Sequence, residues 1–419
     1  MKDCKYLIVG GGVTGLSFAN FAKDDDWLLC EALDDVGGYC KSIHQDGFTW
    51  DYSGHFFHFN TDFVKDLFLS KMKDVDICDV EKITGIIFKN KRIDYPFQKN
   101  IHQLDKDDLL DCLYGLFKRQ SNSSDSFLNM LYSKFGKGIT EKFLKPYNEK
   151  VYVCDLDDLD ADAMGRFFPH ADLDEIISNF KETKKDDSYN NTFIYPRNGS
   201  YEFIKAQLKG INNERIYLNH RLDNIDYKNK IAYFTNGKEI KYQYLISSIP
   251  FNWLLDTARI EYDKKIYTAS KVLVFNLGFD KPSIFNDNWL YFPEKDIIFY
   301  RVGFYDNIFK DDKMSLYVEI GLKQEVKIDE EKMLEKVMVD LKRNGIVTNH
   351  KLLSYKSIVM DPAYVHIKKE SNEDFNKKNQ ILNSFGIYTI GRYGGWKYCS
   401  IEDNIIESNM IYKKLTSGE

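Results

Sequence analysis

Three glycines near the start of the chain have the spacing Gly-x-Gly-x-x-Gly: Gly10, Gly12 and Gly15. An apolar run at residues 6–9 precedes them and another at residues 16–19 follows. This order predicts a strand, a tight turn and a helix whose N-terminus receives the pyrophosphate of a dinucleotide. Gly10 permits the tight turn, Gly12 lets the backbone approach the phosphates, and Gly15 lets the helix pack closely on the strand.

A carboxylate and a second pair of glycines extend this motif. Residues 27–30 form another apolar run that ends in Glu31, where a carboxylate can accept hydrogen bonds from ribose hydroxyls. A glycine pair at 37–38 comes next, followed by a predicted strand that runs into Gly54 and His55. An NAD-dependent dehydrogenase does not usually carry this second part.

This layout resembles the flavoprotein amine-oxidase superfamily, in which the same stretch runs along FAD toward its isoalloxazine ring. The resemblance implies that FAD is the cofactor and that His55 lies beside the flavin, where hydrogen bonding tunes the protonation of N5. The cofactor-binding residues that the motifs and the resemblance together imply are Gly10, Gly12, Gly15, Glu31, Gly38, Gly54, His55, Leu222, Arg392 and Asp403.

The elements that must position these residues alternate along the chain. Strand and helix patterns indicate an α/β fold, with a discontinuous Rossmann-like FAD-binding domain, a helical insertion and an antiparallel β-sheet substrate domain. The predicted ranges are 1–90, 193–250 and 375–419 for the FAD-binding domain, 91–192 for the helical domain and 251–374 for the substrate domain. Within the helical domain, the polar run at 121–125 predicts the link between two helices.

Four further segments resemble UDP-galactopyranose mutase, especially the eukaryotic-type members of that FAD family. Their order and approximate spacing hold over nearly the whole chain, and the Tyr-Pro-Phe-Gln and Tyr-Phe-Pro…Tyr-Arg elements are the most specific. The segments are residues 95–101 (YPFQKNI), 145–152 (KPYNEKVY), 289–301 (WLYFPE…FYR) and 391–398 (GRYGGWKY).

The resemblance implies a nucleotide-sugar site in which arginines and tyrosines bind a diphosphate. A diphosphate carries about two negative charges and matches planar guanidinium forks. Arg301 matches the phosphate-binding arginine of the family by motif, and Arg166 matches by its apolar neighbourhood. The phenols implied to donate to the same phosphates are Tyr291, Tyr364 and Tyr398.

The Tyr-Pro-Phe-Gln element implies where the uridine lies. Phe97 would stack on the uracil ring, with Tyr95 and Gln98 nearby. The further pocket candidates are Asn148, Tyr152 and Asn190. Tyr152 stands where the eukaryotic relatives carry Trp.

One segment departs from the family pattern. Shortly after Tyr398, where family members carry an amide residue near the phosphates, this chain has Glu402 and Asp403. A carboxylate at Glu402 would repel a diphosphate. Either the local register shifts and brings Asn404 into play, or the substrate differs from UDP-galactose.

The sequence contains no motif for a catalytic acid–base dyad or a protein nucleophile. The resemblance implies that N5 of reduced FAD attacks the anomeric carbon, so that the pyranose and furanose forms of a UDP-sugar interconvert without net redox change. His55, Arg301 and Arg166 are the implied catalytic residues, and the arginines would act where charge builds on the departing phosphate oxygen. NAD(P)H is the expected reductant, and galactofuranose for cell-surface polysaccharides is the expected product.

Two other functions stay open. One is an FAD-dependent amine-oxidase-like oxidoreductase, in which N5 accepts a hydride, and the other is a flavoprotein that only binds a nucleotide sugar. The arginine–tyrosine phosphate cluster favours the mutase over the oxidoreductase, because a hydrophobic amine or porphyrin substrate would not need it.

Composition narrows the partners and the compartment. The 419 residues include 58 Lys and Arg against 64 Asp and Glu, a net charge of −6, with no basic run and interleaved aromatics, so nucleic acid is not an expected partner. Seven scattered cysteines, without a Cys-x-x-Cys pair, predict a reducing, cytoplasmic location. No apolar run approaches the roughly 20 residues of a membrane span. The eight histidines have no metal-ligand spacing, so no metal is expected, and a homo-oligomer stays open.

Overall fold

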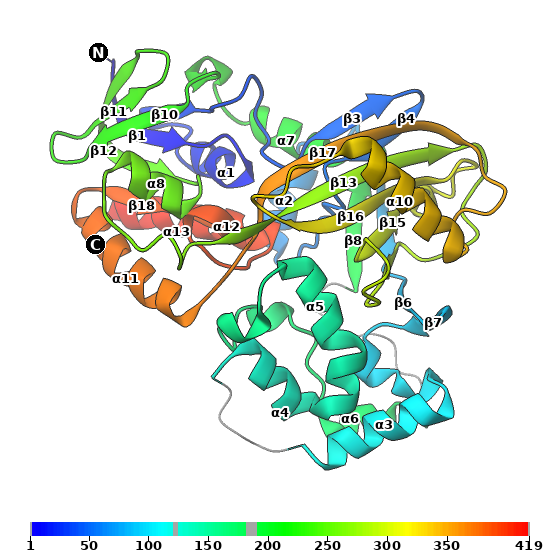
Figure 1. Cartoon of the computed structure of the whole chain (residues 1–419). Helices are drawn as coiled ribbons and strands as arrows, with labels where there is room; N and C mark the ends of the chain where they lie inside the picture. The colour runs from blue at the N-terminus through cyan, green and yellow to red at the C-terminus, as the bar shows by residue number, and fades with distance from the viewer. Residues whose placement is uncertain (1, 120–124, 182–190, 418–419) are drawn as a thin grey trace.

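The computed structural model describes residues 2–119, 125–181 and 191–417. Most of the predicted link at 121–125 and the pocket candidate Asn190 lie outside the described residues. Two large sheets and a helical part make up the molecule (Figure 1). In that view the first sheet lies at the upper left, the second at the upper right and the helical part below.

The first sheet contains the N-terminal strand at its centre. Its strand order is β10-β11-β12-β1-β2-β9, with β18 paired to β12. β1 runs parallel to both β12 and β2, which places Val9 beside Ser247 and Cys30. The strands are β1 (Lys2–Val9), β2 (Trp27–Cys30), β9 (Ile216–Tyr217), β10 (Leu222–Asp226), β11 (Ile231–Phe234), β12 (Glu239–Ser247) and β18 (Ile387–Thr389).

Helices cover this sheet because its parallel strands are apolar on both faces. All four residues of β2 are buried, and α1 packs against both α7 and α13. The helices that follow or cover these strands are α1 (Val13–Phe21), α2 (Asp62–Leu69), α7 (Tyr201–Leu208), α8 (Phe251–Thr257), α11 (Lys369–Ser384), α12 (Gly391–Gly394) and α13 (Ile401–Ser417). This is the Rossmann-like part of the predicted fold.

The second sheet is antiparallel apart from one pair. Its order is β17-β13-β16-β15-β14-β6-β7, in which β14 and β6 are parallel. α10 (Glu330–Arg343) covers one face through Val337 and Leu341, and α9 (Asp306–Phe309) follows β15. The strands are β6 (Thr84–Phe88), β7 (Lys91–Asp94), β13 (Ala269–Phe279), β14 (Trp289–Tyr291), β15 (Arg301–Phe304), β16 (Ser315–Lys323) and β17 (Leu352–Val365).

The helical part is held by close helix packing. α3 (Lys106–Phe117) and α4 (Phe127–Ile139) cross where Gly115 faces Gly138, since a Cβ on Gly115 would lie 2.6 Å from the Gly138 nitrogen. A turn of π-helix at Thr140–Leu144 leads into α5 (Lys145–Tyr152), and α6 (Leu173–Ser178) begins with a capping box. Short 3₁₀ turns lie at Phe97–Lys99, Ile101–Gln103, Leu156–Asp158 and Gly165–Phe167.

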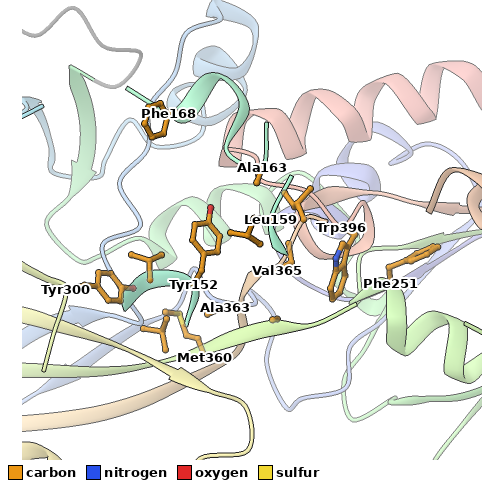
Figure 2. Close-up of a cluster of buried hydrophobic side chains, with 14 of the residues drawn as sticks. Tyr152, Leu159, Ala163, Phe168, Phe251, Tyr300, Met360, Ala363, Val365 and Trp396 are labelled. Carbon is orange, nitrogen blue, oxygen red and sulfur yellow. The ribbon is translucent and has the colours of Figure 1, made fainter. Parts of the chain in front are cut away.

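One buried cluster joins the three parts. Figure 2 shows Ala163 and Phe168 from the helical part, Met360 and Val365 from the second sheet, and Trp396 in the same cluster of side chains. Continuous packing of this kind fixes the parts relative to one another.

Some strands cross the domain ranges that we predict. β6 lies within 1–90 but belongs to the second sheet. β8 (Thr192–Pro196), which starts at the edge of the range 193–250, pairs with β5 (Ile77–Glu81) outside both large sheets. The reason is that an apolar pattern predicts a strand but does not indicate the sheet in which that strand pairs.

The segment around His55 also differs from expectation. β3 (Ser42–Gln45) and β4 (Phe48–Asp51) form a hairpin, but the chain after Asp51 is irregular, with Phe57 making an isolated bridge to Ile194. His55 therefore lies in a loop and not on a strand.

Candidate functional site

A cavity of about 540 Å³ lies where the helical part meets the second sheet. The loop after β4, helix α5, the segment 164–170 and strands of the second sheet all line it. The predicted site residues that it brings together are Gly54, Tyr95, Asn148, Tyr152, Arg166, Tyr291, Arg301, Tyr364 and Tyr398. These residues lie far apart in the sequence, so the fold assembles the site.

A buried ion pair forms part of the cavity wall. The antiparallel register of β15 and β16 places Arg301 opposite Glu319. Arg301 donates from Nε to Oε2 of Glu319 at 2.8 Å and from Nη2 to Oε1 at 2.6 Å. This two-point contact fixes the plane of the guanidinium, and Nη1 makes no hydrogen bond within the described residues. Arg301 is therefore an oriented donor at the cavity wall.

Glu319 also connects this pair to the loop that carries His55. The Ser53 hydroxyl donates to Oε1 of Glu319. Sequence reasoning missed Glu319, because its role depends on the strand register opposite Arg301 and no local motif marks it.

Tyrosine side chains surround the arginine. The rings of Tyr364 and Tyr398 stack at 6.3 Å between centroids, and Tyr152 meets Tyr364 edge-on at 5.9 Å. Burial raises the pKa of Tyr291 and of Tyr364, so both phenols stay protonated at neutral pH and can donate hydrogen bonds. Asn148 donates its side-chain amide to the Leu144 carbonyl at 2.7 Å. The wall can thus bind an anionic oxygen-rich group.

A second arginine lies beside these tyrosines. The guanidinium carbon of Arg392 is 4.5 Å from the ring centroid of Tyr398 and 5.3 Å from that of Tyr364. Its Nε is buried without a hydrogen-bond partner among the described residues, and none of the ion pairs there involves it. A buried guanidinium N–H without a hydrogen-bond partner can donate to an anionic group of a ligand.

Arg166 and Asp403 contact each other at the edge of the cavity. Nη2 of Arg166 lies 2.5 Å from Oδ1 of Asp403, and the Arg166 guanidinium also lies over the Phe167 ring. The pair joins the Gly165–Phe167 turn of the helical part to the first turn of α13. The two residues, predicted for substrate and for cofactor respectively, thus form an ion pair with each other.

Glu402 does not face the cavity. Both of its oxygens accept hydrogen bonds from the backbone of Asn60 and Thr61, at 2.8–3.1 Å, directly before α2. Asn404 accepts from the Arg392 backbone nitrogen at 2.9 Å. The concern that Glu402 repels a diphosphate is therefore wrong, because this carboxylate serves the N-terminus of a helix.

His55 is neutral in this setting. Its Nδ1 donates to the Ser53 carbonyl at 3.2 Å, and burial lowers the pKa of His55 to about 4. Gly54, the residue before it, lies against Tyr317, since a Cβ there would be 2.3 Å from the Tyr317 hydroxyl. A side chain at position 54 would therefore collide with the Tyr317 hydroxyl.

Two predicted uridine residues lie behind the cavity wall. Phe97 is fully buried, and its ring stacks on Phe143 at 5.1 Å between centroids. Gln98 is also fully buried, donates to the Pro169 carbonyl and does not line the cavity. The expectation that Phe97 stacks directly on a base is wrong in this structure, since Phe97 belongs to the core of the helical part.

The glycine motif has the geometry that a dinucleotide requires. Gly10 has a φ of +103°, and a Cβ on Gly15 would lie 2.0 Å from the Gly10 carbonyl oxygen. Gly12 precedes α1 without a side-chain cap and faces Gly38, whose Cβ would lie 3.3 Å from the Gly12 Cα. The backbone is therefore bare where phosphates would approach.

The carboxylate of Glu31 accepts from the backbone nitrogens of Gly11 at 2.6 Å and Leu33 at 2.9 Å. The backbone just before Leu222 contacts the end of β2, since the His220 nitrogen donates to the Glu31 carbonyl at 2.8 Å. Glu31 and Leu222 thus lie at the same end of the first sheet.

The described part of the chain lacks metal-ligating clusters and membrane-spanning helices. Its residues contain no group of three or more His, Cys, Asp or Glu that could hold a metal ion. None of its helices is long and apolar enough to cross a membrane. All seven cysteines are free.

Comparisons with known proteins agree with this fold. Residues 8–68 match the family model of an NAD(P)-binding Rossmann-like domain. The structure is similar to that of a reduced UDP-galactopyranose mutase, with a TM-score of 0.92 and 24% sequence identity over 99% of this chain and 94% of that one. The predicted resemblance and fold class are confirmed at the level of the fold.

Two oxidases have the same fold at lower similarity. One is a candidate protoporphyrinogen oxidase from Exiguobacterium sp. 255-15, with a TM-score of 0.77 and 15% identity over 100% of this chain and 99% of that one. The other is a putrescine oxidase, with a TM-score of 0.68 and 12% identity over 99% of each chain. The fold thus occurs with different activities.

Proposed function

We propose that this protein is a flavin-dependent mutase that interconverts the pyranose and furanose forms of a UDP-sugar, UDP-galactose or a similar compound. The observation that carries the proposal is the oriented Arg301 among the phenols of Tyr291, Tyr364 and Tyr398 in one cavity. The similarity of the whole fold to a UDP-galactopyranose mutase supports it.

FAD is the cofactor that the nucleotide-binding residues fit. Gly12 and Gly38 leave a bare backbone before α1, and Arg392 offers a buried donor without a protein partner. Gly10, Gly15, Glu31 and Leu222 would hold the rest of the dinucleotide. Bound FAD, once reduced, would supply the nucleophile that the protein side chains lack. The family model and the flavoenzyme neighbours support a dinucleotide here.

The chain's own residues would bind and orient the substrate. Nη1 of Arg301 and the phenols would hold the diphosphate, and their donors would stabilise the charge on the leaving phosphate oxygen. Arg166, at the edge of the cavity, would release Asp403 and bind the diphosphate in its place. His55, neutral at pH 7, would act as a hydrogen-bonding group and not as a cation.

The base would bind at the end of the cavity formed by the helical part. Tyr95, Phe143 and Phe168 line this end, and Asn148 and Tyr152 lie between it and the phosphate site. NAD(P)H as the reductant and a cytoplasmic location stay predictions of the sequence.

The second candidate is an FAD-dependent amine-oxidase-like oxidoreductase. The specific observation in its favour is the shared fold with a putrescine oxidase. The cavity wall offers guanidinium and phenol donors, Arg301 and Tyr291 among them. A cationic amine would leave these donors without acceptors, which disfavours it as the ligand.

The two candidates differ in their use of electrons. Protein loaded with FAD is supplied with UDP-galactopyranose and dithionite, and both sugar forms are followed by chromatography. The mutase exchanges the forms and consumes no reductant in proportion to turnover, whereas the same protein with oxidised flavin is inactive. Stoichiometric oxidation of the sugar, or turnover with oxidised flavin alone, would contradict the proposal.

A further inference from the structure

Tyr317 lies on the cavity wall next to the arginine that the sequence points to, but no motif marks it. It is on β16, two residues before Glu319, so the two side chains lie on the same face of the strand. The guanidinium carbon of Arg301 is 5.8 Å from the Tyr317 ring centroid. The side chain is fully buried and lines the cavity.

Two glycines make the space for this ring. Gly303 pairs with Tyr317 across β15 and β16, and a Cβ there would lie 2.1 Å from ring atoms of Tyr317. A Cβ on Gly54 would lie 2.3 Å from the Tyr317 hydroxyl. Neither glycine has a positive φ, so the backbone conformation does not require them. Both glycines therefore serve to bring the phenol between the arginine and the loop of His55.

The hydroxyl that reaches this place has no partner. Oη of Tyr317 is buried and makes no hydrogen bond within the described residues. A buried tyrosine hydroxyl normally finds a partner, because an unmade hydrogen bond away from water costs free energy. Burial raises the pKa of Tyr317, so the group remains a donor at neutral pH. Because Tyr317 lines the cavity, a ligand bound there can supply the missing acceptor.

We propose that Tyr317 is a catalytic residue whose hydroxyl donates a hydrogen bond to the sugar of the nucleotide sugar. The inference rests on the proposed function, since the sugar is the part of the ligand between the diphosphate at Arg301 and the cofactor near Gly54. Tyr317 differs in role from Tyr291, Tyr364 and Tyr398, because its contact orients the reacting ring and not the phosphates.

The structure offers a matched control in Tyr300. Its hydroxyl is also buried without a partner among the described residues, but Tyr300 does not line the cavity. Tyr317→Phe and Tyr300→Phe each remove one unpartnered oxygen and leave no protein group newly unpaired. Both variants should therefore fold, and the melting temperature checks this.

The experiment compares the FAD-loaded wild type, Tyr317→Phe and Tyr300→Phe. Turnover of UDP-galactose under reducing conditions and the Kd of UDP, which lacks the sugar, are measured for each. Tyr317→Phe should lower kcat at least about tenfold, as expected for one lost transition-state contact, and leave the UDP Kd unchanged. Tyr300→Phe should match the wild type.

The outcomes separate this inference from the proposed function. An active wild type with an equally active Tyr317→Phe overturns the inference alone, as does a loss of UDP affinity equal to the loss of turnover. A wild type that turns over no UDP-sugar overturns the proposed function. In that case the Kd values of UDP-galactose and of UDP are measured for the wild type and for Tyr317→Phe. If Tyr317 contacts the sugar, the variant loses affinity for UDP-galactose relative to UDP. An unchanged ratio of the two Kd values contradicts the inference.

Discussion

Two arginine–carboxylate pairs at the same cavity differ in their surroundings. In the wall, Arg301 lies 2.6 Å from Glu319, and the side chains are 21% and 1% exposed. At the edge, Arg166 lies 2.5 Å from Asp403, and the side chains are 55% and 27% exposed. The two ion pairs have nearly equal distances but different interaction energies, because solvent screens the edge pair and not the wall pair.

The difference assigns different tasks to the two arginines. A buried pair is costly to break, so the wall presents Arg301 in a fixed orientation before any ligand arrives. An exposed pair contributes little, so Arg166 can exchange its carboxylate for a ligand at small cost. The following variants test this contrast, beginning with the largest expected effect.

Glu319→Ala removes the carboxylate of the wall pair. Arg301 is then left partly buried without its counter-charge, and the Ser53 hydroxyl loses its acceptor. We expect the free energy of unfolding to fall by about 3–5 kcal/mol, the usual effect of breaking a buried pair. Urea unfolding measures the change, with Glu319→Gln as a control that keeps an acceptor oxygen. A loss below about 1 kcal/mol would place this pair in the same class as the edge pair.

Glu402 and Asp403 offer the same contrast between neighbours on α13. Glu402 is buried and accepts from Asn60 and Thr61, whereas Asp403 is partly exposed and pairs with Arg166. Glu402→Ala should lower the free energy of unfolding by about 1–3 kcal/mol, because the backbone donors at the N-terminus of α2 lose a charged acceptor. Asp403→Ala should cost less than about 1 kcal/mol. Equal losses in urea unfolding would show that burial does not determine how much each carboxylate contributes to the free energy of unfolding.

The smallest expected effect is the coupling between Arg166 and Asp403. A double-mutant cycle with Arg166→Ala and Asp403→Ala should give a coupling energy of about 0.2–1 kcal/mol that shrinks as salt is raised. Chemical unfolding of the wild type and the three variants measures it. A coupling energy above about 2 kcal/mol, unaffected by salt, would mean that the edge pair is shielded from solvent like the wall pair.

The sequence predicts the first sheet better than the cavity. Gly10, Gly12 and Gly15 are close together in the chain, and the strand–turn–helix geometry that they imply is local. The structure reproduces it, with a positive φ at Gly10 and a close approach at Gly15. Local motifs are readable because the backbone conformation that they need is set within a few residues.

The cavity depends on contacts that the sequence does not encode locally. Glu319 and Tyr317 acquire their places only when β15 and β16 pair in one register. Phe97 carries the expected motif but packs on Phe143 in the helical core. Glu402 meets Asn60, 342 positions away in the chain. In each case a long-range contact decides the role of a residue whose type alone is ambiguous.

In our proposal the buried wall, and Arg301 in particular, recognises the diphosphate of a uridine nucleotide. The most direct test is calorimetric titration of the reduced, FAD-loaded protein with UDP, comparing the wild type with Arg301→Ala and Arg166→Ala. A charge-assisted hydrogen bond contributes about 1.5–3 kcal/mol, so Arg301→Ala should weaken UDP binding by at least about tenfold. Arg166→Ala should weaken it by less than about fivefold. No binding of UDP by the wild type, or an equal loss in both variants, would contradict the account.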